Sequence, residues 1–402
     1  MKTEAGTKTE TCHTSWRNRL VIACIALGAL AAAGPATAGS GTLRVDDDKL
    51  QCPEAQFASI QAAVAAAEPG DKVKVCPGLY NEIVTVPKTL ELDGAGPDPR
   101  ERTGDPTEEA VVRSFKLLAP AVVLEGFTIQ GTFPSIVTSQ LFSGYRVERN
   151  LVNSLLVLQT SGFEETRVRQ NVFTDSGIFC SPCPLSRIEQ NLLTGATGIS
   201  VNNTANIEIA HNSSRNVFSV AIRLVFVTDA RVHHNDIENA SQSGIELLLA
   251  TRVDVTHNRV ENAGRLFGAD GIFAASSSSI LIARNTVVDG RGDGLMLSSV
   301  RDSRIEKNEL ERNLVDGIAL RNARANLITH NKSDENGSDG IAADSNSRLN
   351  IIEDNHMRLN GEHDCHDDSV GPNNPPALVA NIWRNNHGLT ENRPGLCRGN
   401  DD

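Results

Sequence analysis

The sequence has few aromatic residues and no long hydrophobic run. Two Trp and two Tyr occur among 402 residues, too few to line a long groove with the flat rings against which sugar units pack. The longest apolar run, Leu20 to Ala33, falls short of the roughly 20 residues that cross a bilayer. We therefore expect no membrane anchor and no extended row of aromatic sugar subsites.

Basic residues are also in the minority. The chain carries 38 Lys and Arg against 50 Asp and Glu, a formal net charge of −12. Nucleic acids are bound through basic surface that neutralises their phosphates, so we expect no nucleic-acid partner.

The first 38 residues have the features of a secretory signal peptide. Arg17 and Arg19 precede the apolar run, and Ala36-Thr37-Ala38 supplies the small residues of a cleavage site. Six cysteines follow it, an even number that in an exported chain indicates three disulfides. They are Cys52, Cys76, Cys180, Cys183, Cys365 and Cys397. We expect a secreted, periplasmic or otherwise extracellular protein.

The rest of the chain repeats one unit of about 23 residues, marked by two features in step. The first is an Asn between two short β-favouring runs, at positions 150, 171, 191, 212, 235, 258, 285, 308, 331 and 355. The second is a small residue followed by an aliphatic one, as in Gly294-Leu295 and Gly317-Ile318. Such short alternating runs predict strands. A unit this small buries its apolar face only by stacking on its copies, about 4.8 Å apart.

The repeat therefore predicts an all-β fold, a single-stranded right-handed parallel β-helix. The Asn series is interpreted as a structural ladder, with each side chain bonded to the next. Residues 57–67 read as a short amphipathic helix that caps the open first coil. Gly94 to Glu109 lacks an apolar period and is expected to loop out.

A family resemblance supports this fold. The segment from Cys52-Pro53 to Gly78-Leu79-Tyr80-Asn81-Glu82 resembles the entry of pectin-lyase-fold proteins, and the later coils resemble NosD-like repeats of exported bacterial proteins. The resemblance implies a fold and no particular activity, because this fold carries many chemistries. We expect a signal peptide at 1–38, an N-terminal cap at 39–80 with the helix and first strand, coils at 81–360 and a C-terminal cap at 361–402. The expected disulfides are Cys52–Cys76, Cys180–Cys183 and Cys365–Cys397.

One acidic row stands out, formed by the residue before each Gly-aliphatic mark. Its last four members are Asp270, Asp293, Asp316 and Asp339. Three interpretations are open. The aspartates cap turns and are screened by water; or Asp293, Asp316 and Asp339 bind a hard cation such as Ca²⁺; or Asp270, Asp293 and Asp316 supply an acid and base in a glycan groove.

Two further rows run beside it. The strand after the acidic row is expected to face outward, and its Arg223 and Phe273, together with Arg321, are the candidate sugar-binding residues. The second row precedes the Asn series and contains His211, His234, His257, Arg284, Lys307 and His330. It is interpreted as a solvated basic edge, with a shared metal ion as the alternative. The run from His363 to Asp368 is interpreted as part of the C-terminal cap, again with a metal site as the alternative.

The active-site motifs of polygalacturonases, pectate lyases and alginate epimerases are mostly missing. The sequence therefore favours a monomeric, accessory β-helix without catalysis of its own, which binds an acidic or cell-surface polysaccharide or an ion such as Ca²⁺. The alternative is a polysaccharide-active enzyme, a lyase, C5-epimerase or glycoside hydrolase, that uses the stacked aspartates.

Overall fold

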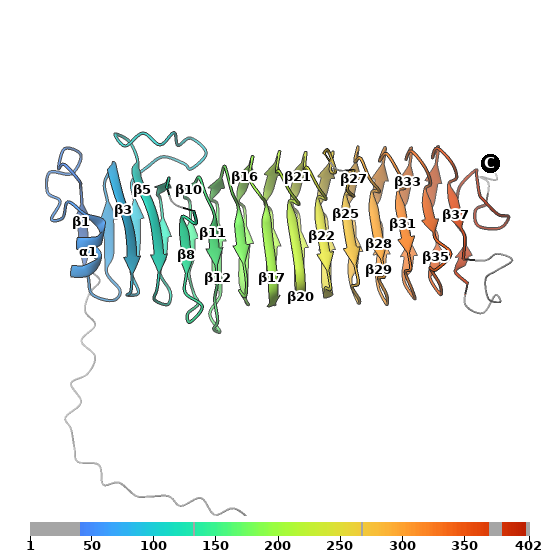
Figure 1. Ribbon diagram of the computed structural model, residues 1–402, viewed down its shortest axis with the longest axis horizontal. Helices are drawn as coiled ribbons and strands as arrows, with labels where there is room; N and C mark the ends of the chain where they lie inside the picture. Colours follow the sequence, from blue (N-terminus) through green and yellow to red (C-terminus); the bar gives the residue numbers. More distant parts are fainter. Residues whose placement is uncertain (1–40, 132, 267, 370–379, 399–402) are drawn as a thin grey trace, which may run out of the picture. The chain divides into compact units, whose positions relative to one another are not determined.

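Short strands follow one another around a coil, and each pairs in parallel with the strand one coil further on (Figure 1). The computed structural model describes residues 41–131, 133–266, 268–369 and 380–398. The expected signal peptide lies outside these residues. The predicted parallel β-helix is confirmed, and no helix among the described residues is long and apolar enough to span a membrane.

The strands form three stacks. Stack 1 follows the acidic row and contains β8 (Ile136–Thr138), β11 (Leu156–Leu158), β14 (Ile178–Cys180), β17 (Ile199–Ala205), β20 (Ile222–His233), β22 (Ile245–Leu248), β25 (Ile272–Ala275), β28 (Leu295–Ser298), β31 (Ile318–Arg321), β34 (Ile341–Ala343) and β37 (Cys365–Asp367).

Stack 2 precedes the Asn series. It contains β1 (Thr42–Val45), β2 (Lys72–Val75), β4 (Glu91–Gly94), β6 (Val123–Glu125), β9 (Arg146–Glu148), β12 (Thr166–Arg169), β15 (Ser186–Glu189), β18 (Glu208–Ala210), the second half of β20, β23 (Thr251–Thr256), β26 (Leu281–Ala283), β29 (Arg304–Glu306), β32 (Leu327–Thr329), β35 (Ile351–Glu353) and β38 (Ile382–Arg384).

Stack 3 follows the Asn series. It contains β7 (Thr128–Ile129), β10 (Leu151–Val152), β13 (Val172–Phe173), β16 (Leu192–Thr194), β19 (Ser213–Arg215), β21 (Asp236–Glu238), β24 (Arg259–Glu261), β27 (Thr286–Val288), β30 (Glu309–Glu311), β33 (Lys332–Asp334) and β36 (His356–Arg358). The longer strands β3 (Gly78–Val86) and β5 (Ala110–Leu117) pair with each other, and β5 continues into both stack 3 and stack 1. Residues 95–109 between β4 and β5 form no strand, as expected for the loop.

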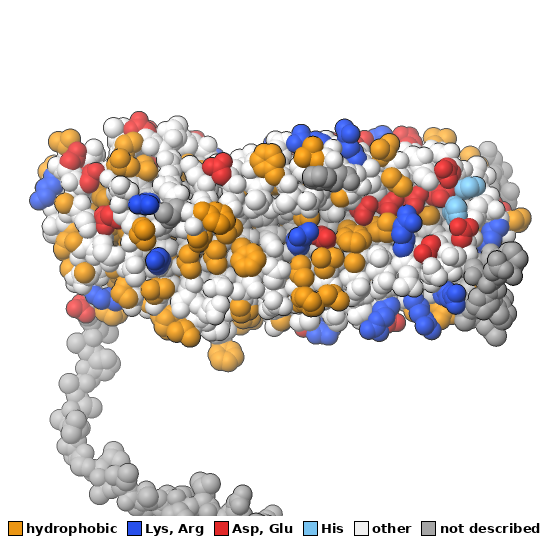
Figure 2. Space-filling view, viewed as in Figure 1, with side chains coloured by type: hydrophobic (Ala, Val, Ile, Leu, Met, Phe, Trp, Pro, Cys, Tyr) orange, Lys and Arg blue, Asp and Glu red, His pale blue; other side chains and the backbone are white. Residues whose placement is uncertain are grey.

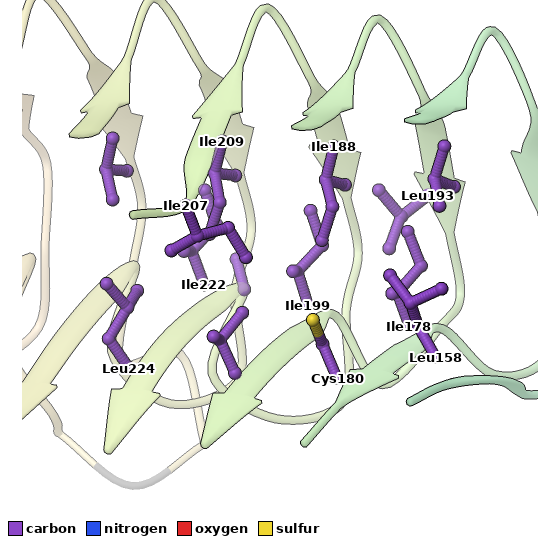
Figure 3. Packing of buried hydrophobic residues seen from close by; sticks show 14 of the residues in the cluster. Leu158, Ile178, Cys180, Ile188, Leu193, Ile199, Ile207, Ile209, Ile222 and Leu224 are labelled. Atoms are coloured by element: carbon purple, nitrogen blue, oxygen red, sulfur yellow. The ribbon is translucent and has the colours of Figure 1, made fainter. Parts of the chain in front are cut away.

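Aliphatic side chains fill the interior of the coil. Figure 3 shows them in rows, one member per coil, as with Ile178 and Ile199 or Ile188 and Ile209. All four are at most 1% exposed. Because every coil places a like residue at the same point, the core is continuous along the stack, and burial of this apolar surface is its main source of stability.

The Asn series forms the predicted ladder. Asn258 donates from its backbone N and its Nδ2 to Oδ1 of Asn285, at 2.9 and 3.0 Å, and its own Oδ1 accepts the same two bonds from Asn235. The pattern repeats from Asn150 to Asn386. The residue before each of these Asn has a positive φ, so the chain bends sharply there and the buried amide satisfies the turn.

The helix α1 (Ile60–Ala66) lies at the N-terminal end, within the range 57–67 expected for it. Its Ile60, Ala63 and Val64 are buried, and Glu82 accepts the backbone N–H groups of Ile60 and Gln61 at 2.9 Å. At the other end, β37 and β38 continue the pairing beyond residue 360. The disulfides are Cys52–Cys76, Cys180–Cys183 and Cys365–Cys397, the pairs expected from the sequence.

Candidate active site

The four aspartates of the acidic row form a hydrogen-bonded ladder along the stack. Oδ1 of Asp270 accepts the backbone N–H of Asp293 at 3.0 Å, and Oδ1 of Asp293 accepts that of Asp316 at 2.9 Å. Oδ1 of Asp316 accepts the backbone N–H of Asp339 at 3.0 Å, and Oδ1 of Asp339 accepts the backbone N–H of His363 at 3.0 Å. Figure 2 shows acidic side chains in a line that leads toward His side chains near the C-terminal end.

The glycine after each aspartate brings the coils close enough for this ladder. A Cβ on Gly294 would lie 2.8 Å from the carbonyl oxygen of Gly317 in the next coil, closer than a side chain tolerates. The Gly294 N–H donates to the Asp316 carbonyl at 2.8 Å. The Asp-Gly pair thus lets both the backbone and the carboxylate bond to the next coil.

Three of the four aspartates are buried and Asp270 is half-buried, so water does not screen the row as one interpretation expected. Asp293, Asp316 and Asp339 are 3, 5 and 4% exposed. Burial raises the pKa of Asp270 to about 6 and that of Asp293 to about 7, and it also raises the pKa of Asp316. Repulsion between neighbouring carboxylates adds to the effect in Asp293. The first three aspartates therefore hold their protons at higher pH than ordinary carboxyl groups.

Asp339 behaves in the opposite way because it meets two imidazoles. Its Oδ1 lies 3.1 Å from Nδ1 of His363, and its Oδ2 lies 2.9 Å from Nδ1 of His366. Burial opposes ionisation of Asp339, but these two histidines outweigh it and lower its pKa. The pKa of His366 is raised to about 9 by Asp339 and then by Asp368, whose Oδ1 lies 3.2 Å from Nε2. Asp339 and His366 thus form an ion pair at neutral pH.

This ion pair lines a cavity of about 260 Å³. Asp316, Arg321, Asp339, His366 and Asp368 contribute its charged groups, together with Asp344. The cavity exists because one outward column of stack 1 becomes smaller along the chain. Phe273 and Met296 occupy this column in β25 and β28, and Ala319 and Ala342 replace them in β31 and β34 before it reaches His366 in β37.

The structure brings together only some of the predicted site residues. Asp316 and Arg321 line the cavity; Asp270 and Asp293 lie further along the ladder. Arg223 pairs with Glu246 in the next coil, in the same column as Phe273. Glu246 and Ala319 belong to the same outward column, but they are only 8 and 1% exposed.

His366 and Asp368 were not predicted as members of this site. At β37 the chain has Asp364-Cys365 in place of the Gly-aliphatic pair. The repeat pattern in the sequence therefore stops one coil before the stack of strands does. The β37 register, in which Cys365 pairs with Ile341 and His366 with Ala342, would place both residues. The only signal in the sequence is the density of His and Asp from 363 to 368.

Three groups of described residues bring at least three metal-ligand atoms within 4.8 Å of one another. They are Asp339, His363 and His366; His211, His233 and His234; and Asp46, Asp47 and Asp48. Asp293 and Asp316 belong to none of these groups. Their raised pKa values also disfavour the ionised form that Ca²⁺ binds, so calcium binding by Asp293, Asp316 and Asp339 stays a prediction.

A larger cavity of about 590 Å³ lies over stack 2. Its charged groups pair with one another, as in the contact of Arg252 with Asp229 at 2.6 Å and that of Arg231 with Glu208 at 3.4 Å. Arg187 also contacts Glu208 at 3.4 Å. These pairs cross from coil to coil and are consistent with a role in stabilising the stack.

Comparison with known proteins supports the fold. Residues 216–387 match the family described as periplasmic copper-binding protein (NosD), and residues 138–287 match the right-handed beta helix region. No curated protein matches the sequence significantly. Solved structures with this fold include a double mutant of the periplasmic alginate epimerase AlgG, at 13% identity and a TM-score of 0.50, covering 80% of this chain and 77% of that one.

Two further structures resemble it over most of its length. The A-module of the mannuronan C-5 epimerase AlgE4 from Azotobacter vinelandii is 13% identical, with coverage of 90 and 96% and a TM-score of 0.48. The DFA-IIIase from Arthrobacter chlorophenolicus A6 is 14% identical, with coverage of 89% of each chain and a TM-score of 0.36. At these identities the likeness concerns the fold alone.

Proposed function

We propose that this right-handed parallel β-helix repeat protein binds an acidic polysaccharide in the cavity beside Arg321, and that the Asp339–His366 pair transfers protons with the bound sugar. The observation that carries the proposal is that an exposed cation and an ionised Asp–His pair line one cavity. Most glycosidases place two carboxyl groups beside the bond they break, and this cavity places several carboxyl groups next to a basic side chain.

Arg321 supplies the preference for an anion. It is exposed, and within the described residues it forms no ion pair. A guanidinium binds a carboxylate through two parallel hydrogen bonds. The protonated His366 adds a second positive charge to the cavity. The acidic ladder repels an anionic ligand less than its composition suggests, because burial keeps Asp270, Asp293 and Asp316 protonated to higher pH.

His366 is suited to donate a proton. Asp339 and Asp368 hold its imidazole from two sides, and its pKa of about 9 keeps it protonated at neutral pH. Asp316, with its raised pKa, is a second candidate donor on the cavity wall. Once His366 has given one proton to the sugar, its neutral imidazole accepts the next proton from the sugar, and Asp339, which stays ionised, stabilises the imidazolium that forms again.

Binding without catalysis is the second candidate function. It is favoured by the scarcity of Trp and Tyr and by the absence of the sequence motifs of the known enzymes with this fold. The three disulfides fit an exported protein that meets extracellular glycans in either case. The alginate epimerases with a similar fold make alginate the first polysaccharide to test.

The test measures binding and turnover separately. Alginate, polygalacturonate and neutral dextran are titrated by calorimetry against the parent, Arg321→Gln and the matched control Arg324→Gln, an exposed arginine of the same coil that does not line this cavity. We expect the parent to bind an acidic polymer and not dextran, and Arg321→Gln alone to lose binding. Equal affinity in the two variants, or no binding by the parent, overturns the proposed site.

Turnover is followed by reducing ends, by absorbance of unsaturated products and by proton NMR of epimerised sugars. We expect His366→Gln to bind the acidic polymer more weakly than the parent and, at saturating polymer, to turn it over much more slowly. A parent that binds without any turnover removes the catalytic half of the proposal and assigns an accessory role.

A further inference from the structure

Three imidazoles stack along one edge of the coil, away from the cavity described above. His211, His234 and His257 each stand directly before an Asn of the ladder, at the turn from stack 2 to stack 3. The acidic row stands at the turn from stack 3 to stack 1. The rings of His211 and His234 are 5.0 Å apart and those of His234 and His257 are 4.9 Å apart, and both pairs are stacked.

His233 brings a fourth imidazole into the same place. Its ring stands edge-on to those of His211 and His234, with centroids 5.9 and 5.2 Å away. Its Nδ1 lies 3.0 Å from Nδ1 of His234. Two nitrogens bound to one tetrahedral ion are separated by roughly 3.3 Å, given metal–nitrogen bonds of about 2.0 Å. The two rings therefore already stand close to the spacing that a shared ion needs.

Glu208 holds His233 in this position. Its Oε1 lies 2.9 Å from Nε2 of His233, which leaves Nδ1 directed at His234. A carboxylate on the far nitrogen of an imidazole is the usual partner of a metal-bound histidine, since it fixes the tautomer and orientation of the ring. Arg231 and Arg187 lie 3.4 Å from the other oxygen of Glu208 and keep it ionised.

The rest of the edge lacks these features. In the three coils after His257, the same position is occupied by Arg284, Lys307 and His330. His330 contacts the hydroxyl of Thr329 at 2.7 Å and stacks on no other imidazole among the described residues. The cluster at His211, His233 and His234 is therefore more than a solvated basic edge, because the nitrogens of three imidazoles meet at one place and a carboxylate holds one of the rings.

We propose that His211, His233 and His234 bind one borderline divalent transition cation, of the class of Zn²⁺, Ni²⁺ and Cu²⁺, with Glu208 as the positioning residue of His233. Nitrogen ligands select such ions over Ca²⁺ and Mg²⁺, which prefer oxygen. The ligand atoms of the three residues lie within 4.8 Å of one another, and the exposed sides of His211 and His234 leave the remaining coordination positions to water.

The test titrates Zn²⁺, Ni²⁺, Cu²⁺ and Ca²⁺ into the full chain, purified without a histidine tag, by calorimetry. The variants are His211→Asn, His234→Asn, His233→Gln and Glu208→Gln, with His330→Asn as the control. Asn is chosen because His211, His234 and His330 all have φ between 54 and 57°, a conformation that Asn adopts more easily than most residues. Circular dichroism checks that each variant is folded.

We expect one equivalent of transition metal to bind, and Ca²⁺ not to compete for it. Each of the three ligand variants should weaken binding about a hundredfold and Glu208→Gln at least about tenfold, while His330→Asn leaves the affinity unchanged. Electron paramagnetic resonance of the Cu²⁺ complex should show nitrogen ligands that disappear in His234→Asn. Binding that is lost equally in His330→Asn, or that survives all three ligand variants, or a parent that binds no transition metal, overturns the site.

Discussion

The backbone N–H of Asp316 donates to the side chain of Asp293 in the preceding coil, at 2.9 Å. The contact fixes a carboxyl group in the wall of the coil, where only 3% of the residue is exposed, and its pKa of about 7 follows from that burial. The bond needs an acceptor oxygen and no charge. Ionisation of Asp293 near neutral pH therefore destabilises the folded state.

We predict that Asp293→Asn stabilises the protein, and more so at high pH. A carboxyl group with a raised pKa binds more protons in the folded state than in the unfolded state, so its contribution to stability is full below pH 4 and is lost as the pH rises to about 7. The amide keeps the acceptor oxygen and stays neutral. Thermal unfolding should show a gain on the order of 3 kcal/mol at pH 8 and little gain at pH 4.

Asp175→Asn is the control, because Asp175 is exposed. It should leave the melting temperature unchanged across the same range. A gain for Asp293→Asn that does not depend on pH would show that ionisation is not the cause.

His366 should also make the stability depend on pH, but for a different reason: the fold stabilises its charged form, whereas it stabilises the neutral form of Asp293. Its pKa is raised from 6.5 to about 9 by Asp339 and Asp368, so the imidazolium contributes stability that is fully present below pH 6.5 and is lost as the pH rises through 9. Protonation of Asp339 removes the contribution at the acidic end, since its pKa is lowered in the folded state. We expect His366→Gln to destabilise the protein by about 2 kcal/mol at pH 7 and by much less at pH 10.

Denaturant unfolding at the two pH values checks this prediction. His387→Gln is a suitable comparison, because it changes a histidine outside the cavity. An equal loss at pH 7 and pH 10 would show that His366 acts through packing instead of charge.

Refilling the outward column should close the cavity. Ala342 occupies the position that Phe273 and Met296 occupy in earlier coils, so a large side chain fits the local backbone there. We expect Ala342→Phe to abolish binding of the acidic polymer while the melting temperature changes by only a few degrees. The same calorimetric titration measures it, with Met296→Phe, in the same column, as the comparison that should bind normally.

Breaking the Asn ladder should destabilise the coil without removing a residue of either site. Asn258→Ala removes the acceptor of two buried N–H groups of Asn235 and the donor to Asn285 and Val232. Unsatisfied buried groups cost about 1 to 3 kcal/mol each, so we expect a loss of about 3 kcal/mol in chemical unfolding. Asn202→Ala, which is half-buried and outside the ladder, should cost less than about 1 kcal/mol.

The sequence predicts the fold well because the same physical demand recurs in every coil. Each turn needs an Asn to satisfy its backbone and a small residue where coils approach, so both marks repeat and reveal the period. The acidic row was visible for the same reason. The burial of Asp293 could not be predicted, because it depends on how closely the atoms of the neighbouring coils pack around that side chain.

The two sites were predicted only in part because each depends on a departure from the repeat. His366 follows Asp364-Cys365, where the Gly-Ile mark is missing. His233 stands one position before the basic row, inside β20, and only the orientation of its ring toward His234 links them. The cavity depends on the size of Ala319 and Ala342, which carry no chemical signal of their own.

The Asn ladder also allows such a protein to gain or lose whole coils during evolution. Asn285 and Asn308 are 23 residues apart and bond to their neighbours in the same way. Excising that one unit would leave Asn258 to meet Asn308 and Asp270 to meet Asp316 or its equivalent, with every bond type preserved. Insertions and deletions of whole units, as arise by unequal recombination, would then move the two sites relative to each other in fixed steps along the protein without rebuilding either of them.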